Sequence, residues 1–177
     1  MWIYISISVL VVIIAVILFI YIIHYNKFQI AIIKISEAEE SISILLSKKL
    51  DLLIRINKFI EEKQEEKKLV GIETVASKNL NNFELNSELD KYNKKVTEIT
   101  DYNKDISFEE NELLVIEELS RVNLDCLAAE KYYNDNVVLY NELIKCFPSN
   151  IVGHICKYRM KDFYSNEKEE IFEILKK

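Results

Sequence analysis

The stretch KYYNDNVVLYNELIKCFPSN, residues 131–150, contains an apolar helical stripe, a repeated Tyr-Asn pair and the only proline of the chain. Large side chains recur in it at alternating spacings of four and three, so they lie on one side of a 3.6-residue helix. These residues are Tyr133, Val137, Tyr140, Ile144 and Phe147. The spacing predicts a helix whose core-facing side contains all of them, with Tyr140 as an internal packing residue.

Pro148 marks the predicted end of this helix. Proline lacks a backbone N–H and disfavours helical geometry in the residue before it, so the helix is expected to stop at Phe147. Ser149 or Asn150 is then placed to cap a following helix.

The Tyr-Asn repeat has two open interpretations. Asn134 and Asn141 flank the apolar side seven residues apart. In one interpretation the tyrosine rings are buried and the asparagines hydrogen-bond across helices, which fixes the register of the helices. In the other, Asn134, Asn141 and the turn after Pro148 form an exposed recognition surface at one end of a bundle. The residue pattern is compatible with both.

Composition bounds the fold and the partners. The chain has 177 residues, of which 50% are hydrophobic and 29% charged, and two glycines, which indicates about one domain built mostly of helices. The net charge of -6 argues against a nucleic-acid partner, because nucleic-acid binders carry a basic patch or stripe. Cys126, Cys146 and Cys156 form no CxxC pair, so we interpret them as buried thiols in a reducing compartment.

The segment from Trp2 to Ile23 contains no charged residue. As a helix it rises about 33 Å, enough to cross a hydrocarbon core about 30 Å thick. A cleaved signal peptide is the alternative, but the apolar run is too long, no basic residue precedes it and no A-x-A-like site follows. Residues 1–25 are therefore predicted to be a transmembrane anchor that contacts the lipid bilayer through residues 2–23.

The charges next to the span predict its orientation. No Lys or Arg precedes it, whereas Lys27, Lys34, Lys48 and Lys49 follow it. Basic residues favour the cytoplasmic side of a membrane. We therefore expect a single-pass protein of the cell membrane, with its N-terminus outside and its body in the cytoplasm.

After the span, a heptad pattern predicts one long amphipathic helix. Its stripe consists of Phe28, Ala31, Ile35, Ala38, Ile42, Leu45, Lys49, Leu52, Ile56 and Phe59. Leu46, Leu53 and Ile60 widen this stripe, which favours a bundle over a dimeric coiled coil. The polar residues 61–68 are expected to form the solvated last turn, with Gly71 at the C′ position.

The remaining pattern completes an all-α prediction. Residues 72–100 are expected to be helical with a break within residues 81–87, and residues 101–107 to form a turn. A capping box of Ser107 and Glu110 then starts a third helix, whose predicted core face consists of Val115, Leu119, Val122, Cys126, Ala129 and Tyr133. Ile151, Val152 and Ile155 indicate a short fourth helix.

The predicted architecture is an N-terminal transmembrane helix followed by an up-and-down antiparallel four-helix bundle. The anchor occupies residues 1–25, the bundle residues 26–160 and a short amphipathic C-terminal tail residues 161–177. In the tail, Asn166-x-x-Glu169 is expected to cap a last helical turn.

The pattern Tyr133-Asn134-x-x-Val137-x-x-Tyr140-Asn141-x-x-Ile144-x-x-Phe147-Pro148 resembles the C-terminal signature of the LemA family. Lys48-Lys49-x-Asp51-Leu52 resembles the family's Arg-Arg-x-Asp-Leu, and Asp105-Ile106 stands where the family has a Tyr-Pro-Asp-Leu turn. The resemblance covers nearly the whole chain. It implies a single-pass protein with a cytoplasmic helical bundle, an unresolved molecular function and a membrane zinc protease of the envelope-stress response as a partner.

The sequence contains no recognised pattern for catalysis or cofactor binding. Gly71 and Gly153 are too far apart for a phosphate loop, and neither His24 nor His154 belongs to a Glu-x-x-His motif. Cys146, His154 and Cys156 lack the spacing and the fourth ligand of a zinc module. We therefore expect no cofactor and no metal, and His154 to be a surface or capping residue.

Two classes of function remain. The favoured hypothesis is a non-enzymatic, membrane-anchored helical adaptor or scaffold, which binds a membrane protein or a second copy of itself. The alternatives are an enzyme with an unrecognised site and an accessory factor of a membrane protease in envelope stress.

Overall fold

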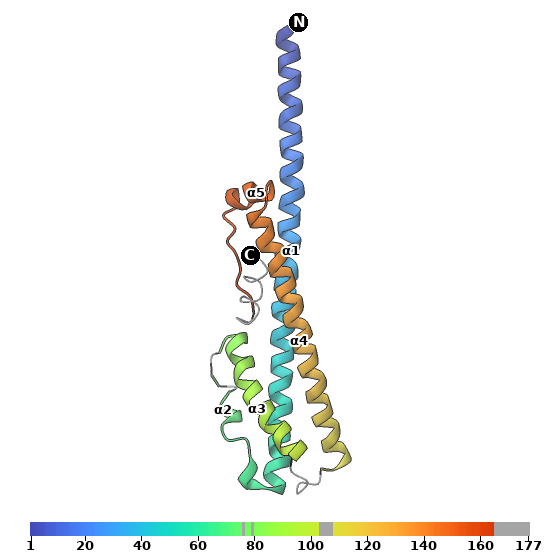
Figure 1. The fold of residues 1–177 in the computed structure, drawn as a ribbon, viewed down its shortest axis with the longest axis vertical. Coiled ribbons are helices and arrows are strands. Elements are labelled where there is room, and N and C mark those ends of the chain that lie inside the picture. Colours follow the sequence, from blue (N-terminus) through green and yellow to red (C-terminus); the bar gives the residue numbers. More distant parts are fainter. Residues whose placement is uncertain (76, 79, 103–107, 165–177) are drawn as a thin grey trace. The chain divides into compact units, whose positions relative to one another are not determined.

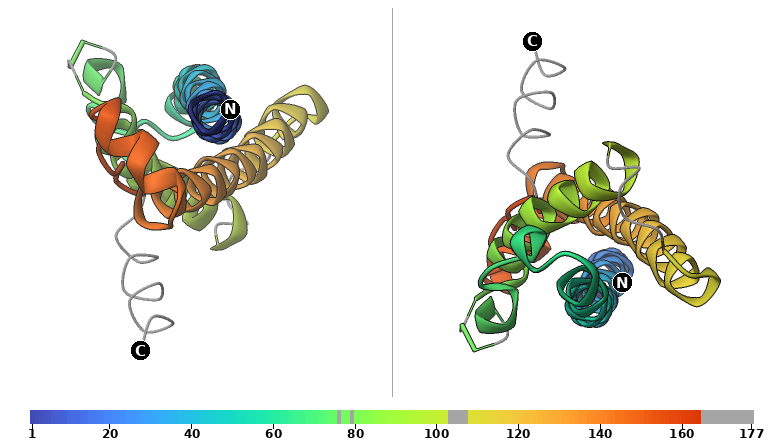
Figure 2. Two further views of the ribbon diagram at one scale, coloured as in Figure 1. Left: turned by 90° about the horizontal axis from the view of Figure 1, so that it is seen from above. Right: turned by 90° about the horizontal axis from the view of Figure 1, so that it is seen from below.

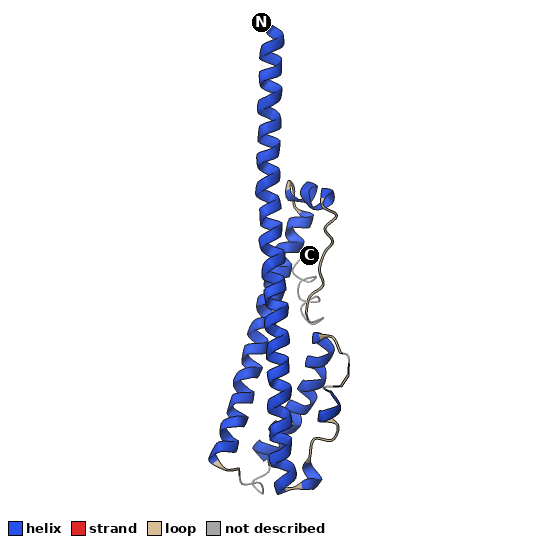
Figure 3. Ribbon diagram, turned by 180° about the vertical axis from the view of Figure 1, so that it is seen from behind, coloured by secondary structure: helices blue, strands red, loops and turns tan. Residues whose placement is uncertain are grey.

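The computed structural model describes residues 1–75, 77–78, 80–102 and 108–164. All regular structure in these ranges is helical (Figure 3). Along the chain the elements are α1 (Trp2–Lys63), the 3-10 turn η1 (Glu65–Lys67), α2 (Ile72–Val75), α3 (Asn82–Tyr102), α4 (Glu110–Lys145) and α5 (Ser149–Ile155), labelled in Figure 1. The prediction of an all-α bundle with a long apolar N-terminal helix is confirmed.

The chain divides into two compact units. The terminal unit consists of Met1–Glu37 and Tyr133–Lys177, and the middle unit consists of Ala38–Tyr132. Helices α1 and α4 each contribute one part to each unit. The two units are described separately below.

Helix α1 is one unbroken helix of 62 residues. The large apolar side chains of residues 2–20 are all exposed, and this part is long and apolar enough to cross a membrane. From Phe28 onward most of the predicted stripe is buried, with Phe28, Ile35 and Ile56 fully inaccessible, whereas Leu45 and Phe59 are half-buried. The heptad pattern therefore identified the core-facing side of the helix.

The end of α1 differs from the expectation. The helix stops at Lys63, earlier than residues 61–68 predicted, and η1 follows. Gly71 has a φ of 89°, the left-handed backbone that glycine favours, but it precedes α2 instead of closing α1. A hydrogen bond joins the segment after η1 to α1: the backbone N–H of Leu69 donates to Oδ1 of Asn57.

Helix α3 begins with a capping box formed by Asn81 and Glu84. The backbone N–H of Glu84 donates to Oδ1 of Asn81 (2.9 Å), and the backbone N–H of Asn81 donates to Oε2 of Glu84 (3.1 Å). The break expected near residues 81–87 therefore lies at the beginning of that segment, because the chain is helical from Asn82 on. The expected capping box at Ser107 and the turn at Asp105-Ile106 lie outside the described residues.

In the middle unit, α3 runs in the same direction as α1 and opposite to α4. Asn82 contacts Glu39 and Lys49 contacts Asp90, so positions advance together along α1 and α3. Asn86 contacts Glu130 and Asn93 contacts Asn123, so α3 and α4 are antiparallel. Short loops join neighbouring helices of opposite direction in an up-and-down bundle. Here the chain returns along α1 between Lys63 and Asn82, so α1 and α3 have the same direction. Figure 2 shows α1 along its axis, with α3 and α4 beside it.

The turn after α4 also corrects the expectation. Helix α4 ends at Lys145, and the side chain of Phe147 is 79% exposed, so Phe147 is not a core residue. It follows the last helical residue and therefore no longer lies on the apolar side. Pro148 occupies the N-cap position of α5 without a side-chain bond, while the Ser149 hydroxyl donates to the Cys146 carbonyl (2.8 Å). Neither Ser149 nor Asn150 caps α5, because both lie within it.

Candidate functional site

The asparagines of the Tyr-Asn repeat bind the segment that follows α5. Asn141 makes two hydrogen bonds to Lys161: its Nδ2 donates to the carbonyl (2.8 Å) and its Oδ1 accepts from the backbone N–H (2.9 Å). Oδ1 of Asn134 accepts from the backbone N–H of Tyr164 (2.8 Å). Both asparagines are buried: Asn134 is 4% exposed and Asn141 is 7% exposed. An amide side chain matches a peptide group in donor and acceptor, so it pairs with an extended backbone.

The tyrosines of the repeat contact the same segment. The Tyr133 hydroxyl donates to the carbonyl of Asp162 (3.2 Å). Tyr140 is 4% exposed, which confirms its assignment to the core, and it packs against Phe28 with ring centroids 5.8 Å apart and against Tyr158 at 6.4 Å. Hydrogen bonds thus join the repeat to residues 161–164, while the Tyr140 ring packs against Tyr158 and against Phe28 of α1.

Tyr158 connects this segment to α1. Its ring lies 4.9 Å from that of Phe28, and its hydroxyl accepts a hydrogen bond from Nε2 of Gln29 (2.8 Å). Burial raises the pKa of both Tyr140 and Tyr158 above the ordinary value, so both hydroxyls are neutral at physiological pH. Gly153 allows α5 to lie close to the Phe28 ring of α1, because a Cβ at this position would be only 3.3 Å from Cζ of Phe28.

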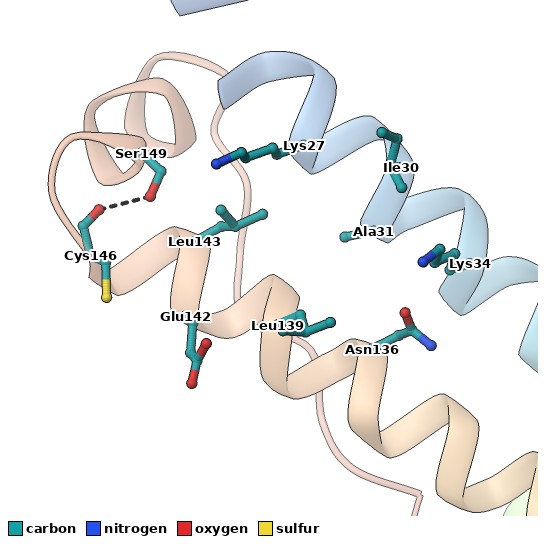
Figure 4. A pocket seen from close by; sticks show the side chains of 10 residues that line it. All are labelled: Lys27, Ile30, Ala31, Lys34, Asn136, Leu139, Glu142, Leu143, Cys146 and Ser149. Atoms are coloured by element: carbon teal, nitrogen blue, oxygen red, sulfur yellow. Dashed lines mark hydrogen bonds between the residues drawn. The ribbon is translucent and has the colours of Figure 1, made fainter. Parts of the chain in front are cut away.

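A groove lies between α1 and α4 of the terminal unit, next to this cluster (Figure 4). Its volume is about 380 Å³, within the range of small-ligand sites. The α1 wall is one helical face, because its residues are spaced i, i+3, i+4 and i+7. The lining residues are Lys27, Ile30, Ala31, Lys34, Asn136, Leu139, Glu142, Leu143, Cys146 and Ser149.

The groove has an apolar floor and a charged rim. In Figure 4, Leu139 and Leu143 extend from α4 towards α1, whereas Glu142 extends away from α1. Lys27 and Lys34 are exposed on the α1 side, and neither forms an ion pair within the part of the chain that the structure describes. The rim therefore carries two ammonium groups available to a ligand.

The middle unit contains a polar cluster around one buried lysine. Lys49 is 2% exposed, and its Nζ lies 2.6 Å from Oδ1 of Asp90 and 3.3 Å from Oδ1 of Asn86. Asn86 in turn donates to Oε1 of Glu130 (2.7 Å). These bonds join α1, α3 and α4. The sequence signalled only Lys49, by a charged residue at a core position of the heptad.

The predicted site residues divide between the units. Asp51 is exposed and Leu52 is buried in the middle unit, whereas the whole Tyr-Asn motif lies in the terminal unit. Ile144 is half-buried and Phe147 is exposed, and Pro148 lies at the turn into α5. Val137 is fully buried. The contacts of the motif therefore gather around residues 158–164, whereas Asp51 and Leu52 belong to the other unit.

The prediction that all three cysteines are buried is wrong. Cys126 is buried, Cys156 is partly exposed and Cys146 is exposed. Burial raises the pKa of the Cys126 thiol to about 11. His154 is exposed. No group of three or more His, Cys, Asp or Glu side chains suited to a metal occurs among the described residues.

Fold and site define the protein as an all-helical chain, in which a long apolar first helix continues into a bundle. The model of the LemA family matches residues 38–174, and the chain therefore belongs to the LemA family. The match begins at the first residue of the middle unit and extends through the Tyr-Asn repeat. No curated protein and no solved structure matches the chain.

Proposed function

We propose that this protein is a single-pass membrane-anchored adaptor or scaffold with its helical bundle in the cytoplasm. Helix α1 carries the proposal. Its exposed apolar first part continues without a break into the buried stripe of the bundle. Apolar side chains at this density are stabilised by lipid rather than water. The same helix thus serves as anchor and as structural element of the bundle.

An exposed leucine surface on α4 supports the interaction role. Leu113, Leu124 and Leu127 are 52%, 67% and 61% exposed. Their spacing places them within about 60° on the helix, in the part of α4 that belongs to the middle unit. Exposed apolar residues that share a face mark interaction surfaces more often than scattered ones do.

The proposed role is non-enzymatic, with affinity residing in helix surfaces. A membrane protein such as a stress-response zinc protease and a second copy of this chain are the two partners that the proposal includes. An enzyme with an unrecognised site is the alternative, and would need convergent titratable groups with shifted pKa values in a pocket.

Photo-crosslinking in native membranes tests the interaction role. We expect a photoreactive residue at Leu127 to capture a membrane protein or a second copy of the chain. The same residue at Lys58, an exposed position of α1 in the middle unit, serves as the control and should capture neither. Leu124→Glu should abolish the product at position 127. Capture of nothing at Leu113, Leu124 and Leu127 would contradict the adaptor proposal.

Cysteine accessibility tests the orientation. Lys94 is exposed in the middle unit, so Lys94→Cys presents a surface thiol in a background without Cys126, Cys146 and Cys156. We expect protection from a membrane-impermeant thiol reagent in intact cells and full labelling after lysis. Equal labelling before and after lysis would place the bundle outside.

A further inference from the structure

We propose that the groove between α1 and α4 binds an anionic phospholipid of the surrounding bilayer, with Lys27 and Lys34 contacting the headgroup. This inference rests on the proposed membrane anchoring of α1. It assigns a ligand to the groove, whereas the adaptor role concerns the leucine surface of the middle unit. The two can therefore fail separately.

Position along α1 places the groove at the membrane surface. Lys27 lies four residues after Ile23, the last residue of the apolar segment, which corresponds to about 6 Å of helix. The headgroup layer on each side of a bilayer is about 5 to 8 Å thick. Lys27 is thus at headgroup depth, and Lys34 is about 10 Å farther along the same face. A lipid beside the span therefore meets the groove at its Lys27 end, and its headgroup reaches Lys34, about 16 Å beyond Ile23, by rising along the groove.

Charge complementarity selects an anionic headgroup. The chain as a whole is acidic, with a net charge of -6, yet Lys27 and Lys34 are the only charged residues before Glu37. Both line the groove, and the opposing carboxylate of Glu142 extends away from α1 (Figure 4). Basic residues between helices at the membrane surface bind anionic headgroups, because each ammonium offers a charge-assisted hydrogen bond to phosphate.

The floor of the groove suits an acyl chain. Ile30, Leu139 and Leu143 supply apolar surface between the two walls, and Ile30 and Leu139 are each 54% exposed. The exposed apolar surface of α1 continues from the span to Ile30 and Ile33. An acyl chain could therefore stay in contact with apolar side chains from the span into the groove, with its headgroup against the lysines. Free phosphate would use only the lysines and leave this surface exposed.

Photo-labelling of the full-length protein in lipid nanodiscs tests the site. The probes are phosphatidylglycerol and phosphatidylcholine with the same photoactivatable acyl chain, in a phosphatidylcholine background. We expect the phosphatidylglycerol probe to label peptides that contain Ile30 and Leu139, and the phosphatidylcholine probe to label the span alone. Lys27→Gln and Lys34→Gln should each lower the labelling by about fivefold, the effect of one lysine at an anionic surface.

Matched variants separate groove binding from general effects. Leu139→Trp fills the groove at an exposed position and should abolish the labelling, whereas Leu127→Trp, on the same helix in the middle unit, should not change it. Lys58→Gln is the charge control on α1. Circular dichroism should show the same helicity for all variants. Labelling that ignores the headgroup or the two lysines would overturn the site while leaving the anchoring intact. A protein that does not co-purify with nanodiscs would overturn both.

Discussion

Asn141 carries the densest hydrogen bonding of the Tyr-Asn repeat, because one side chain satisfies both backbone groups of Lys161. Asn141→Ala should destabilise the protein by about 1 to 3 kcal/mol, the cost of partly buried polar groups left without partners. Hydrogen exchange measures this directly: the Lys161 amide should exchange faster in the variant. Glu142→Ala, the neighbouring exposed position, is the control and should leave the exchange unchanged.

Tyr140 and Phe147 form a matched pair from the same predicted stripe. Tyr140 is 4% exposed and Phe147 is 79% exposed. Tyr140→Ala should lower the free energy of unfolding by about 2 to 5 kcal/mol, the range for truncating large buried side chains. Phe147→Ala should change it by less than about 0.5 kcal/mol, as is usual for surface positions. Urea unfolding compares the two, and equal effects would contradict the burial pattern.

Cys126 and Cys146 should differ in reactivity. Burial raises the pKa of Cys126 to about 11, so its thiol is protonated and inaccessible at neutral pH, while Cys146 is exposed. A maleimide should label Cys146 in the folded protein and Cys126 only after unfolding. Because the folded pKa exceeds the unfolded value of about 8.5, the contribution of Cys126 to stability is complete below that pH. It is lost as the pH rises towards 11, and Cys126→Ala should lack this loss.

At the scale of elements, the cluster around Lys49 joins three helices with unequal exposure of its charges. Lys49 is 2% exposed at its side chain, whereas Asp90 is 51% exposed. Asp90→Ala leaves a buried ammonium without its carboxylate and should cost about 3 to 5 kcal/mol. Lys49→Met keeps the volume and leaves a carboxylate that water can solvate, so it should cost less than about 1.5 kcal/mol.

Lys48→Met is the control for this comparison. Lys48 pairs with Glu118 at the surface, where an ion pair contributes about 0 to 1 kcal/mol. Thermal unfolding of the three variants should rank Asp90→Ala far below the other two. A larger loss of stability for Lys49→Met than for Asp90→Ala would contradict this ranking. It would show that the bonds of the Lys49 ammonium contribute more to stability than its burial costs.

Periodicity explains which elements could be predicted. The stripe from Phe28 to Ile56 was identified because heptad spacing directly reports the side of a helix that neighbours cover. The direction of α3 was not, because it depends on the connection after α1, and the hydrogen bond from Leu69 to Asn57 in that connection belongs to no periodic pattern. The partner of Asn141 could not be foreseen either, because a backbone amide at Lys161 looks like any other in a sequence.

At the scale of the whole molecule, the part that follows the span should fold without it. The buried stripe of α1 begins at Phe28, and its partners Tyr140 and Tyr158 also lie after the span. A fragment from Asn26 to Lys177 should therefore be soluble and strongly helical by circular dichroism. A largely unfolded fragment at room temperature would show that the bundle depends on the membrane or on a partner.

The terminal unit is assembled from both ends of the described chain, with the middle unit inserted between them, and this imposes an order on biosynthesis. Phe28 emerges from the ribosome about 130 residues before Tyr158, which is roughly 6 to 26 seconds at ordinary translation rates. The middle unit is complete in sequence once Tyr132 has been synthesised. The aromatic contacts of the terminal unit are completed last, because Phe28 packs against Tyr140 and Tyr158, and a nascent chain that stalls before Tyr140 would leave Phe28 without either ring.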